Sequence, residues 1–305
     1  MEEPLVSVPV ITYNSSEYII EGLESIKAQT YKNIELIISD DCSTDNTVEL
    51  CREWLAKNKD RFVRTSLVTS EKNTGTAGNC NRAISYCHGE WIKMLAGDDL
   101  LLPDCIEKNI EYITKMPDAE VVFSNVQVFK IKNEEKVIDK LYFTKDHEIF
   151  FSLSNENQLK MLLRNNILPA ASSFIRTTLL KKYRYDETYF CLEDAPMWIT
   201  LLQNGIKFFA FNDITAMYRI GDSVMRGNDV YFKRLYFESY IQLFWNKKIC
   251  LCKKYHLEEA YNITRKYILQ MELADLLLRN KKSYINNLLY LGIKIFIRMA
   301  PKFKL

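Results

Sequence analysis

The part of the chain up to Asp99 alternates short apolar runs with segments of helical periodicity, and this limits the possible folds more than any other feature. Residues 6–13, 34–39 and 62–69 are rich in β-branched and apolar residues, and each run leads through polar residues into a helical pattern. A fourth apolar run begins at Trp91. Strands that alternate with helices of about ten residues imply βαβ crossovers. We therefore expect an α/β fold with a mostly parallel sheet flanked by helices.

The pattern changes after about Lys130. A hairpin, a helix, a strand, a second helix and a last strand are expected at residues 126–143, 159–163, 171–176, 194–202 and 207–218. From Val230 onward every segment has helical periodicity. We place a boundary near Asp229, between a domain of residues 1–228 and an all-helical extension of residues 229–305. Pro9, inside the first strand, removes a ladder donor and indicates incomplete pairing or a bulge there.

Composition and charge argue against several classes of protein. The formal net charge is +2 over 305 residues, which argues against nucleic acid as a partner. The eight cysteines are scattered and the residues after Met1 do not resemble a secretory signal, so we expect a cytoplasmic protein without disulfides. Cys250 and Cys252 lack a second pair or a histidine at zinc-site spacing. No run of about twenty uncharged apolar residues occurs, so a spanning helix is not expected.

The fourth apolar run ends in two adjacent carboxylates, Asp98 and Asp99. Open α/β sheets bind ligands at the carboxyl ends of their strands, and carboxylate oxygens suit Mg²⁺ or Mn²⁺ holding a diphosphate. Such a pair raises its own pKa values until a cation binds. The alternative is a turn in which Asp99 or Asp104 caps the helix that begins near Pro103. The pair alone leaves both interpretations open.

Several segments together are similar to the inverting glycosyltransferases of family 2, which have the GT-A fold and use nucleotide-diphosphate sugars. These segments are residues 6–14, 37–45, 73–92, 97–99 and 185–194, in the family's order and spacing. The second resembles the family's Asp-Asp-Gly-Ser-x-Asp segment, with Cys42 in place of glycine. The fourth stands where the family has Asp-x-Asp, and the last resembles the segment with the catalytic base. The resemblance covers about residues 5 to 220.

Two departures from the family pattern concern the metal site. Ala96 stands at the first acid of the Asp-x-Asp signature, which leaves Asp98 and Asp99 as its acids. The family often has a histidine after a Tyr-Arg pair near the end of the domain, and the sequence here continues from Arg219 without one. Asp222 is only a weak candidate for the third ligand.

The resemblance implies a nucleotide and metal site in the first half of the domain. Asp40 is implied to accept the imide N–H of uracil, while Asp41 could instead cap the next helix. The full set of implied nucleotide contacts is Thr12, Tyr13, Asn14, Asp40, Asn73, Gly75, Gly78 and Asp98. Asp98 would face the ribose and donor sugar, and Asp99 would hold Mn²⁺ or Mg²⁺ on the diphosphate. Tyr13 would pack on the base or belong to the core, and the glycines would admit the nucleotide or merely form a turn.

The second half of the domain is implied to hold the acceptor. Asp194 is the implied general base, which removes the acceptor hydroxyl proton while that oxygen attacks the anomeric carbon and inverts its configuration. Glu193 would support it. The alternative for Asp194 is an N-cap or first-turn acid of the next helix. Trp198, one helical turn further, either forms the floor of the acceptor pocket or belongs to the core.

The resemblance therefore implies a metal-dependent glycosyltransferase of the hexosyltransferase class. It would move a sugar from a nucleotide-diphosphate donor, with UDP favoured, to a saccharide or lipid-linked saccharide in surface polysaccharide synthesis. One rival is a catalytically silent nucleotide-sugar-binding subunit, which the residues Ala96 and Gly221 would explain. The other is a metal-dependent nucleotidyltransferase, although no Gly-rich phosphate loop follows the first strand.

The C-terminal tail differs in charge from the rest of the chain. Residues 276–305 contain seven Lys or Arg and no Asp or Glu. One helical stripe holds Ser283, Asn287, Tyr290, Lys294 and Arg298, and apolar residues cover the rest of that segment. A wide apolar arc with basic edges suits a helix lying on the inner face of an anionic membrane, where a lipid-linked acceptor would be found. Packing on the main domain or in a homodimer is the alternative, and periodicity does not decide between them.

Overall fold

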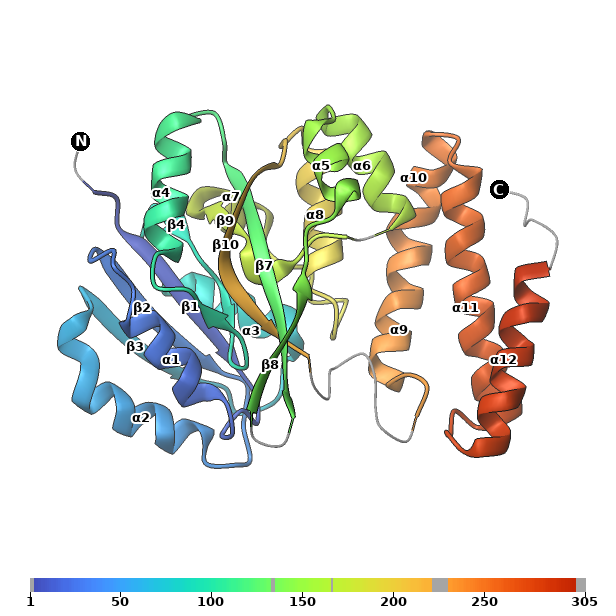
Figure 1. Ribbon diagram of the computed structural model, residues 1–305, viewed down its shortest axis with the longest axis horizontal. Coiled ribbons are helices and arrows are strands. Elements are labelled where there is room, and N and C mark those ends of the chain that lie inside the picture. Colours follow the sequence, from blue (N-terminus) through green and yellow to red (C-terminus); the bar gives the residue numbers. More distant parts are fainter. Residues whose placement is uncertain (1–2, 133–134, 166, 221–229, 300–305) are drawn as a thin grey trace.

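The computed structural model describes residues 3–132, 135–165, 167–220 and 230–299 (Figure 1). Within these ranges, ten strands form one sheet in the order β3-β2-β1-β4-β9-β7-β10-β6, with β5 beside β1 and β8 beside β7. The strands are β1 (Val6–Thr12), β2 (Ile34–Asp40), β3 (Arg64–Thr69), β4 (Trp91–Ile92), β5 (Leu95–Ala96), β6 (Leu100–Leu101), β7 (Val121–Lys132), β8 (Glu135–Leu141), β9 (Phe174–Arg176) and β10 (Phe209–Arg219). The predicted α/β fold is confirmed: β1 to β5 pair in parallel, as do β7 and β10, and antiparallel pairs join β6, β8 and β9.

Helices cover both faces of this sheet and form two cores. The α-helices are α1 (Ile19–Lys27), α2 (Thr47–Asn58), α3 (Gly75–Ser85), α4 (Cys105–Lys115), α5 (Lys145–Ser152), α6 (Asn155–Arg164), α7 (Thr177–Tyr183), α8 (Asp194–Gln203), α9 (Arg234–Leu243), α10 (Ile249–Lys254), α11 (Glu258–Leu278) and α12 (Tyr284–Met299). Residues of α1, α2 and α4 pack with one face of β1 and β2, whereas α3, α6 and α8 share the other core. The sequence did not predict α5.

Pro9 lies in β1, which pairs with β2 in an unbroken parallel register, so no bulge occurs between these strands. On the other side of β1, β4 pairs before Pro9 and β5 pairs after it. The N–H groups of Lys93 and Gly97 donate to the carbonyl oxygens of Ser7 and Ile11 on this side. Because alternate residues of a strand point to the same side, the missing donor of Pro9 falls in the gap between β4 and β5.

The fourth apolar run is not the single continuous strand that the sequence predicted. It forms β4 and β5, with two residues each, and the ladder is interrupted at Lys93 and Met94. The side chain of Lys93 is buried, and its Nζ donates to the carbonyl oxygens of Ala171 at 2.6 Å and Ser173 at 3.4 Å. A buried ammonium group requires such acceptors. Through these hydrogen bonds, Lys93 connects the first half of the sheet to the short 3₁₀ helix η2 (Ala170–Ser172).

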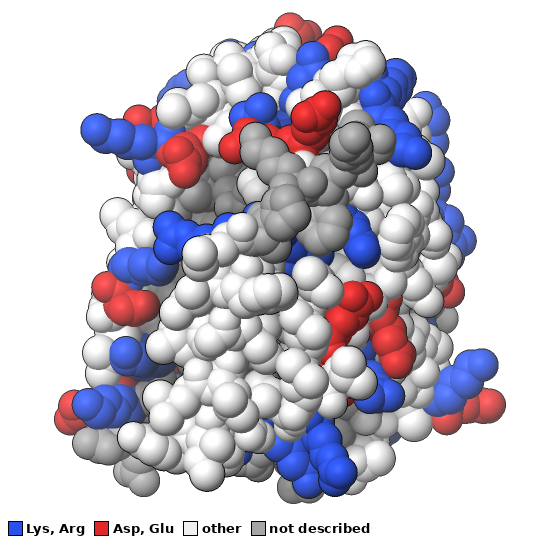
Figure 2. Space-filling model, turned by 90° about the vertical axis from the view of Figure 1, so that its right-hand side faces the viewer, with Lys and Arg blue, Asp and Glu red and all other residues white. Residues whose placement is uncertain are grey.

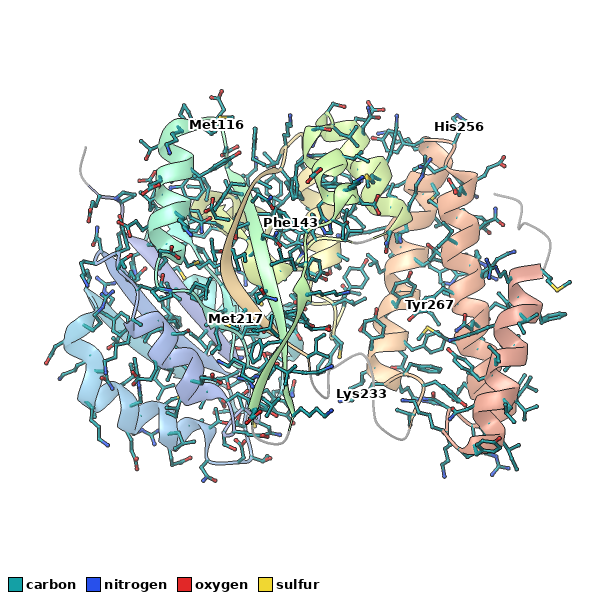
Figure 3. All side chains as sticks on the ribbon, in the orientation of Figure 1. Met116, Phe143, Met217, Lys233, His256 and Tyr267 are labelled. Carbon is teal, nitrogen blue, oxygen red and sulfur yellow. The ribbon has the colours of Figure 1, made fainter. Side chains whose placement is uncertain are left out.

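The last strand of the sheet brings a distant part of the chain beside the two acids. β10 is parallel to β7 and antiparallel to β6, and Met217, which is labelled in Figure 3, pairs with Leu100. Asp99 directly precedes β6 and Arg219 ends β10. The antiparallel register therefore places Arg219 next to Asp98 and Asp99.

The helical extension predicted after Val230 is present. It begins with α9, passes through a π-helical turn, η3 (Phe244–Lys248), and α10, and ends in the α11–α12 pair at one side of the molecule (Figure 1). Tyr267 of α11 points toward α9 and meets Tyr240 edge-on, with ring centroids 5.1 Å apart (Figure 3). The expected boundary near Asp229 lies outside the described residues, so the division into two domains stays a prediction. Within the described ranges, no helix is long and apolar enough to cross a membrane.

Candidate active site

The predicted nucleotide residues gather at the carboxyl ends of the parallel strands. Thr12 ends β1 and is paired with Asp40 at the end of β2, while Ile11 is paired with Ala96 of β5. The chain then passes through Gly97, where a Cβ would lie 3.1 Å from the Ser15 hydroxyl and 3.4 Å from Thr12 Cβ. The loop after β1 and the loop that carries the acids are thus in close contact.

Asp98 and Asp99 are held by Arg219. The backbone N–H of Arg219 donates to Asp99 Oδ1 at 3.0 Å, and its Nε donates to the carbonyl oxygen of Asp98 at 2.9 Å. The same guanidinium pairs with Glu21 of α1, which also binds Lys136 of β8 at 2.7 Å. The hypothesis that Asp99 caps the next helix is wrong, because its carboxylate is bonded to β10 and the N-cap residue of α4 is Asp104.

Burial disfavours the ionised form of both carboxyl groups. Burial raises the pKa of Asp98, and burial together with the Asp98 carboxylate raises the pKa of Asp99 well above its ordinary value. No third His, Cys, Asp or Glu joins them in a metal-binding group among the residues that the structure describes, and Asp222 lies outside those residues. The donor set still fits Mg²⁺ or Mn²⁺, since these ions use one or two carboxylates and complete their shell with phosphate oxygens and water.

The acids at the end of β2 are engaged in loop contacts. Asp40 is only 1% exposed and accepts hydrogen bonds from the backbone N–H and the hydroxyl of Ser43, at 2.8 and 2.5 Å. Asp41 accepts from the N–H and hydroxyl of Thr74 and pairs with Arg82. Asp41 therefore binds the start of α3 and does not cap α2. A carboxylate has about four lone-pair directions, so Asp40 keeps the capacity to accept a further bond.

The residues at and just after the end of β1 differ in whether their side chains are free to bind a ligand. Tyr13 is 47% exposed, so the alternative in which it belongs to the core is wrong. The Thr12 hydroxyl is buried and has no hydrogen-bond partner in the part of the chain that the structure describes. Asn14 has a φ of 50°, and its Oδ1 accepts from the backbone N–H of Thr44 at 2.8 Å. Asn14 thus joins two loops, while Thr12 and Tyr13 offer unused groups.

The turn before α3 packs against Phe190, in the segment that leads to α8. Asn73 Oδ1 accepts from the N–H of Gly75, which has a φ of +78°. A Cβ on Gly75 would lie 2.5 Å from the carbonyl oxygen of Phe190, and one on Gly78 would lie 2.7 Å from the Thr74 hydroxyl. These glycines are required by packing alone. Nucleotide contacts of Asn73, Gly75 and Gly78 stay predictions.

Glu193 and Asp194 lie at the start of α8. Asp194 is the first residue of α8 and accepts from the N–H of Ala195, while Glu193 occupies the N-cap position without a side-chain cap bond. Burial, and then the Asp194 carboxylate, raise the pKa of Glu193 to about 8. Asp194 is therefore not the N-cap residue, which is Glu193, but it is an acid in the first turn of α8, as the other part of that alternative expected.

The Tyr218 side chain connects the two groups of acids. Burial, and then the carboxylates of Asp99, Asp98 and Asp194, together raise the pKa of Tyr218 to about 12. All three carboxylates therefore act on one hydroxyl at the end of β10. This shared influence indicates that the predicted metal pair and the predicted base lie on the same side of the sheet, although Asp99 and Asp194 are 95 positions apart in sequence.

Trp198 is not part of this site. It is 1% exposed and packs edge-on against Phe123 and Phe208, with centroid distances of 5.2 and 5.8 Å. It faces the core because the side of α8 that carries it packs on the sheet. The prediction of an acceptor-pocket floor is wrong, and the core interpretation of Trp198 is confirmed.

Arg219 and Glu21 were missed as site residues. Arg219 is 6% exposed, and its guanidinium lies over the rings of Tyr18 and Phe129 at 4.6 and 4.7 Å. The Tyr-Arg pair at the end of the domain was a signal, but its partner Glu21 lies 198 positions earlier. A pairing over that distance leaves no local pattern.

Glu193 gives a prediction about pH. Its raised pKa means that the folded chain keeps a proton that the unfolded chain loses above pH 4.5, so stability falls between about pH 4.5 and 8. Glu193→Gln is expected to remove this loss, at most about 1.4 kcal/mol per pH unit. Thermal melts across this range should show the variant gaining on the wild type as pH rises. Glu49→Gln on the exposed side of α2 is the control, and equal pH profiles for Glu193→Gln and wild type would contradict the assignment.

The fold and the grouped acids define a glycosyltransferase of the GT-A type. The sequence pattern described as Glycosyl transferase family 2 matches residues 7–184. The Escherichia coli protein UDP-Glc:alpha-D-GlcNAc-diphosphoundecaprenol beta-1,3-glucosyltransferase WfaP is 30% identical over 233 residues, covering 76% of this chain and 82% of its own. The chain therefore belongs to glycosyl transferase family 2.

Two solved structures share the fold. S. aureus TarS 1-349 in complex with UDP-GlcNAc gives a TM-score of 0.60 at 17% identity, with 95% of this chain and 79% of that chain covered. The mannosyltransferase PcManGT from Pyrobaculum calidifontis, in complex with GDP-Man and Mn²⁺, gives 0.53 at 18% identity, with 98% and 71% covered. The GT-A fold expected from the sequence is confirmed.

Proposed function

We propose that this glycosyltransferase inverts configuration as it moves a sugar from a UDP-linked donor to a lipid-linked saccharide in surface polysaccharide synthesis. The observation that carries this proposal is the arrangement at the carboxyl ends of β1, β2 and β5, where Asp40 is paired with Thr12 and the Asp98–Asp99 pair is held by Arg219. The carboxylates of Asp98, Asp99 and Asp194 all raise the pKa of Tyr218, which supports placing Asp194 at the same site. Such a site can hold a diphosphate leaving group on one side and an acceptor base on the other. The name of WfaP supports the donor and acceptor classes, because it combines UDP-Glc with a diphosphoundecaprenol-linked sugar.

The chemistry assigned to Asp194 is proton removal. Its carboxylate takes the acceptor hydroxyl proton while that oxygen bonds to the anomeric carbon, and the bond from that carbon to the diphosphate breaks on the opposite face. This single displacement inverts the anomeric centre. Glu193, whose pKa is raised to about 8, stays protonated at neutral pH and removes one negative charge from the pair.

The nucleotide half of residues 1–228 is assigned to the loops after β1 and β2. The exposed ring of Tyr13 packs on the base, the unpartnered hydroxyl of Thr12 bonds the nucleoside, and Asp40 accepts the uracil imide N–H. Asp98 faces the ribose and the donor sugar. Asp99 is assigned to Mn²⁺ or Mg²⁺, which would neutralise charge on the departing diphosphate. The Mn²⁺ in the PcManGT complex supports this choice of metal.

A thermal-shift panel of UDP, GDP and dTDP, each with and without Mn²⁺, tests the proposal. A ligand that binds only the native state raises the melting temperature by mass action, so UDP with Mn²⁺ should give the largest shift. A larger shift with GDP would overturn the nucleotide assignment. Turnover of a UDP-sugar would exclude a catalytically silent binding subunit. That alternative was suggested by Ala96, which stands at the first acid of the Asp-x-Asp signature.

Asp40→Ala is expected to weaken UDP binding by about 1–3 kcal/mol, because a buried imide N–H loses its acceptor. Isothermal titration of UDP with Mn²⁺ measures the loss. Ser43→Ala is the control, since it removes the hydroxyl bond to Asp40 and the bond from the Asn14 N–H but leaves the Asp40 carboxylate in place. If both variants lose affinity equally, Asp40 is only a turn residue.

A further inference from the structure

The last helix, α12, packs on the rest of the protein through a narrow face that holds few of its apolar residues. The residues of α12 that turn toward the extension are Asn286, Tyr290, Ile293 and Ile297, which recur at helical spacing. Tyr290 stacks on Tyr231 with centroids 4.1 Å apart, and its hydroxyl accepts from the side-chain amide of Gln270 at 2.5 Å. Only Ile293 and Ile297 are buried apolar residues of this helix. Most of its apolar surface therefore faces away from the protein.

The outward face of α12 is apolar along its whole length. Its exposed large apolar residues are Tyr284, Ile285, Leu288, Leu289, Leu291, Ile295, Phe296 and Met299. Leu276 and Leu277, near the end of α11, are exposed as well, at 77% and 61%. We call these ten residues the apolar face. Single exposed apolar residues are ordinary on a protein surface, whereas a contiguous group of this kind marks an interaction site.

Basic residues accompany the apolar face. Lys294 and Arg298 lie along one edge of α12, and Arg279, Lys281 and Lys282 lie in the turn before it. Residues 276–305 contain no acid. Figure 2 looks onto this side of the molecule and shows a broad uncharged area in its centre and lower half, bordered by basic side chains and, right of the centre, by acidic ones as well. The combination selects a partner that is apolar and negatively charged.

We propose that the apolar face binds the surface of an anionic membrane, with α12 lying in the plane of the interface. Its apolar side chains enter the boundary between headgroups and acyl chains, and its basic residues meet anionic headgroups. A second copy of the chain fits less well. In a two-fold interface between α12 helices the basic residues of each copy would find no acidic partner in the same segment of the other, because residues 276–305 contain no Asp or Glu.

The proposal deepens the proposed function, because it rests on an acceptor that is lipid-linked. The extension that carries α12 also contacts the segment leading to Asp194. The Ser239 hydroxyl of α9 accepts from the N–H of Cys191 at 3.2 Å, and Lys247 of η3 pairs with Asp186 at 3.4 Å. A membrane-bound extension would therefore hold the acceptor side of the site near the surface that supplies the lipid.

Co-sedimentation of the full chain with vesicles tests the proposal. Vesicles of phosphatidylcholine with phosphatidylglycerol are expected to retain the protein, and vesicles of phosphatidylcholine alone are not. A variant with Leu288→Ser, Leu291→Ser, Ile295→Ser and Phe296→Ser should lose retention. Lys294→Gln with Arg298→Gln should weaken it by roughly fivefold for each charge. Val63→Ser with Ile138→Ser, two exposed apolar residues away from α12, is the matched control and should bind as the wild type does.

Three outcomes would overturn the proposal. They are equal retention by both vesicle types, retention that survives the four serine substitutions, and a dimer in light scattering that those substitutions dissolve. The last would assign the apolar face to a second copy. The UDP thermal shift and turnover of a soluble acceptor are measured on the same variants. Vesicle binding without any turnover would remove the proposed function and leave the membrane site standing.

Discussion

Asp194→Asn is expected to lower kcat by about 10²- to 10⁴-fold, the usual contribution of a positioned general base. The asparagine can still accept the bond from the Ala195 N–H, so α8 should begin at the same residue. UDP affinity and Mn²⁺ dependence should change little, because neither contact is assigned to this carboxylate. Steady-state kinetics at saturating donor and acceptor, together with UDP titration, measure both quantities.

The control for Asp194 is Asp186→Asn, a neighbouring acid that pairs with Lys247 of the extension. It should affect acceptor KM or stability more than the chemical step. Asparagine is about as good as aspartate near a helix start, so a purely structural Asp194 would leave kcat nearly unchanged. A near wild-type kcat in Asp194→Asn would thus remove this residue from the chemistry.

Asp99→Asn is expected to abolish the Mn²⁺-dependent part of the UDP thermal shift and with it most turnover. Asparagine Oδ1 can still accept from the Arg219 N–H, so the loop should keep its shape. The substitution also removes a buried acid whose pKa is raised well above its ordinary value, and the protein without metal should therefore be no less stable than the wild type at neutral pH. Melting curves with UDP alone and with UDP and Mn²⁺ separate the two effects.

Asp104→Asn is the control for Asp99, since Asp104 is a nearby acid that pairs with Lys108 on α4. It should retain the whole Mn²⁺-dependent shift. An unchanged shift in Asp99→Asn would mean that the metal, if one binds, is held by other residues.

Local patterns predicted the parts of the fold that depend on near neighbours in sequence. The alternation of strands and helices placed β1, β2 and β3 and the acids after β5, because each strand carries its own apolar run. The hairpin of β7 and β8 and the helices of the extension were predicted for the same reason. Their ends differ from the predicted ones by a few residues.

Distant contacts account for what the sequence did not predict. The break between β4 and β5 depends on Lys93 reaching carbonyl groups near residue 172, and the glycine turn before α3 depends on Phe190. Arg219 joins the site through its bonds to Asp98 and Asp99, and its guanidinium also pairs with Glu21 of α1. Trp198 was placed in two ways because helical spacing does not say which side of α8 meets the sheet. In each case the deciding partner lies far away in sequence.

The core that α3, α6 and α8 share also includes residues of the helical extension. It contains Ala77 of α3 and Trp198 of α8 together with Phe244, Ile268 and Met271 of the extension. The free-energy effects of substitutions at contacting residues are not additive, so a substitution in the extension changes the effect on stability of substitutions in α3 and α8. An extension exchanged between two relatives would therefore need compensating substitutions in α6 and α8. Such an exchange is expected to fold well only when both sides of this core are inherited together.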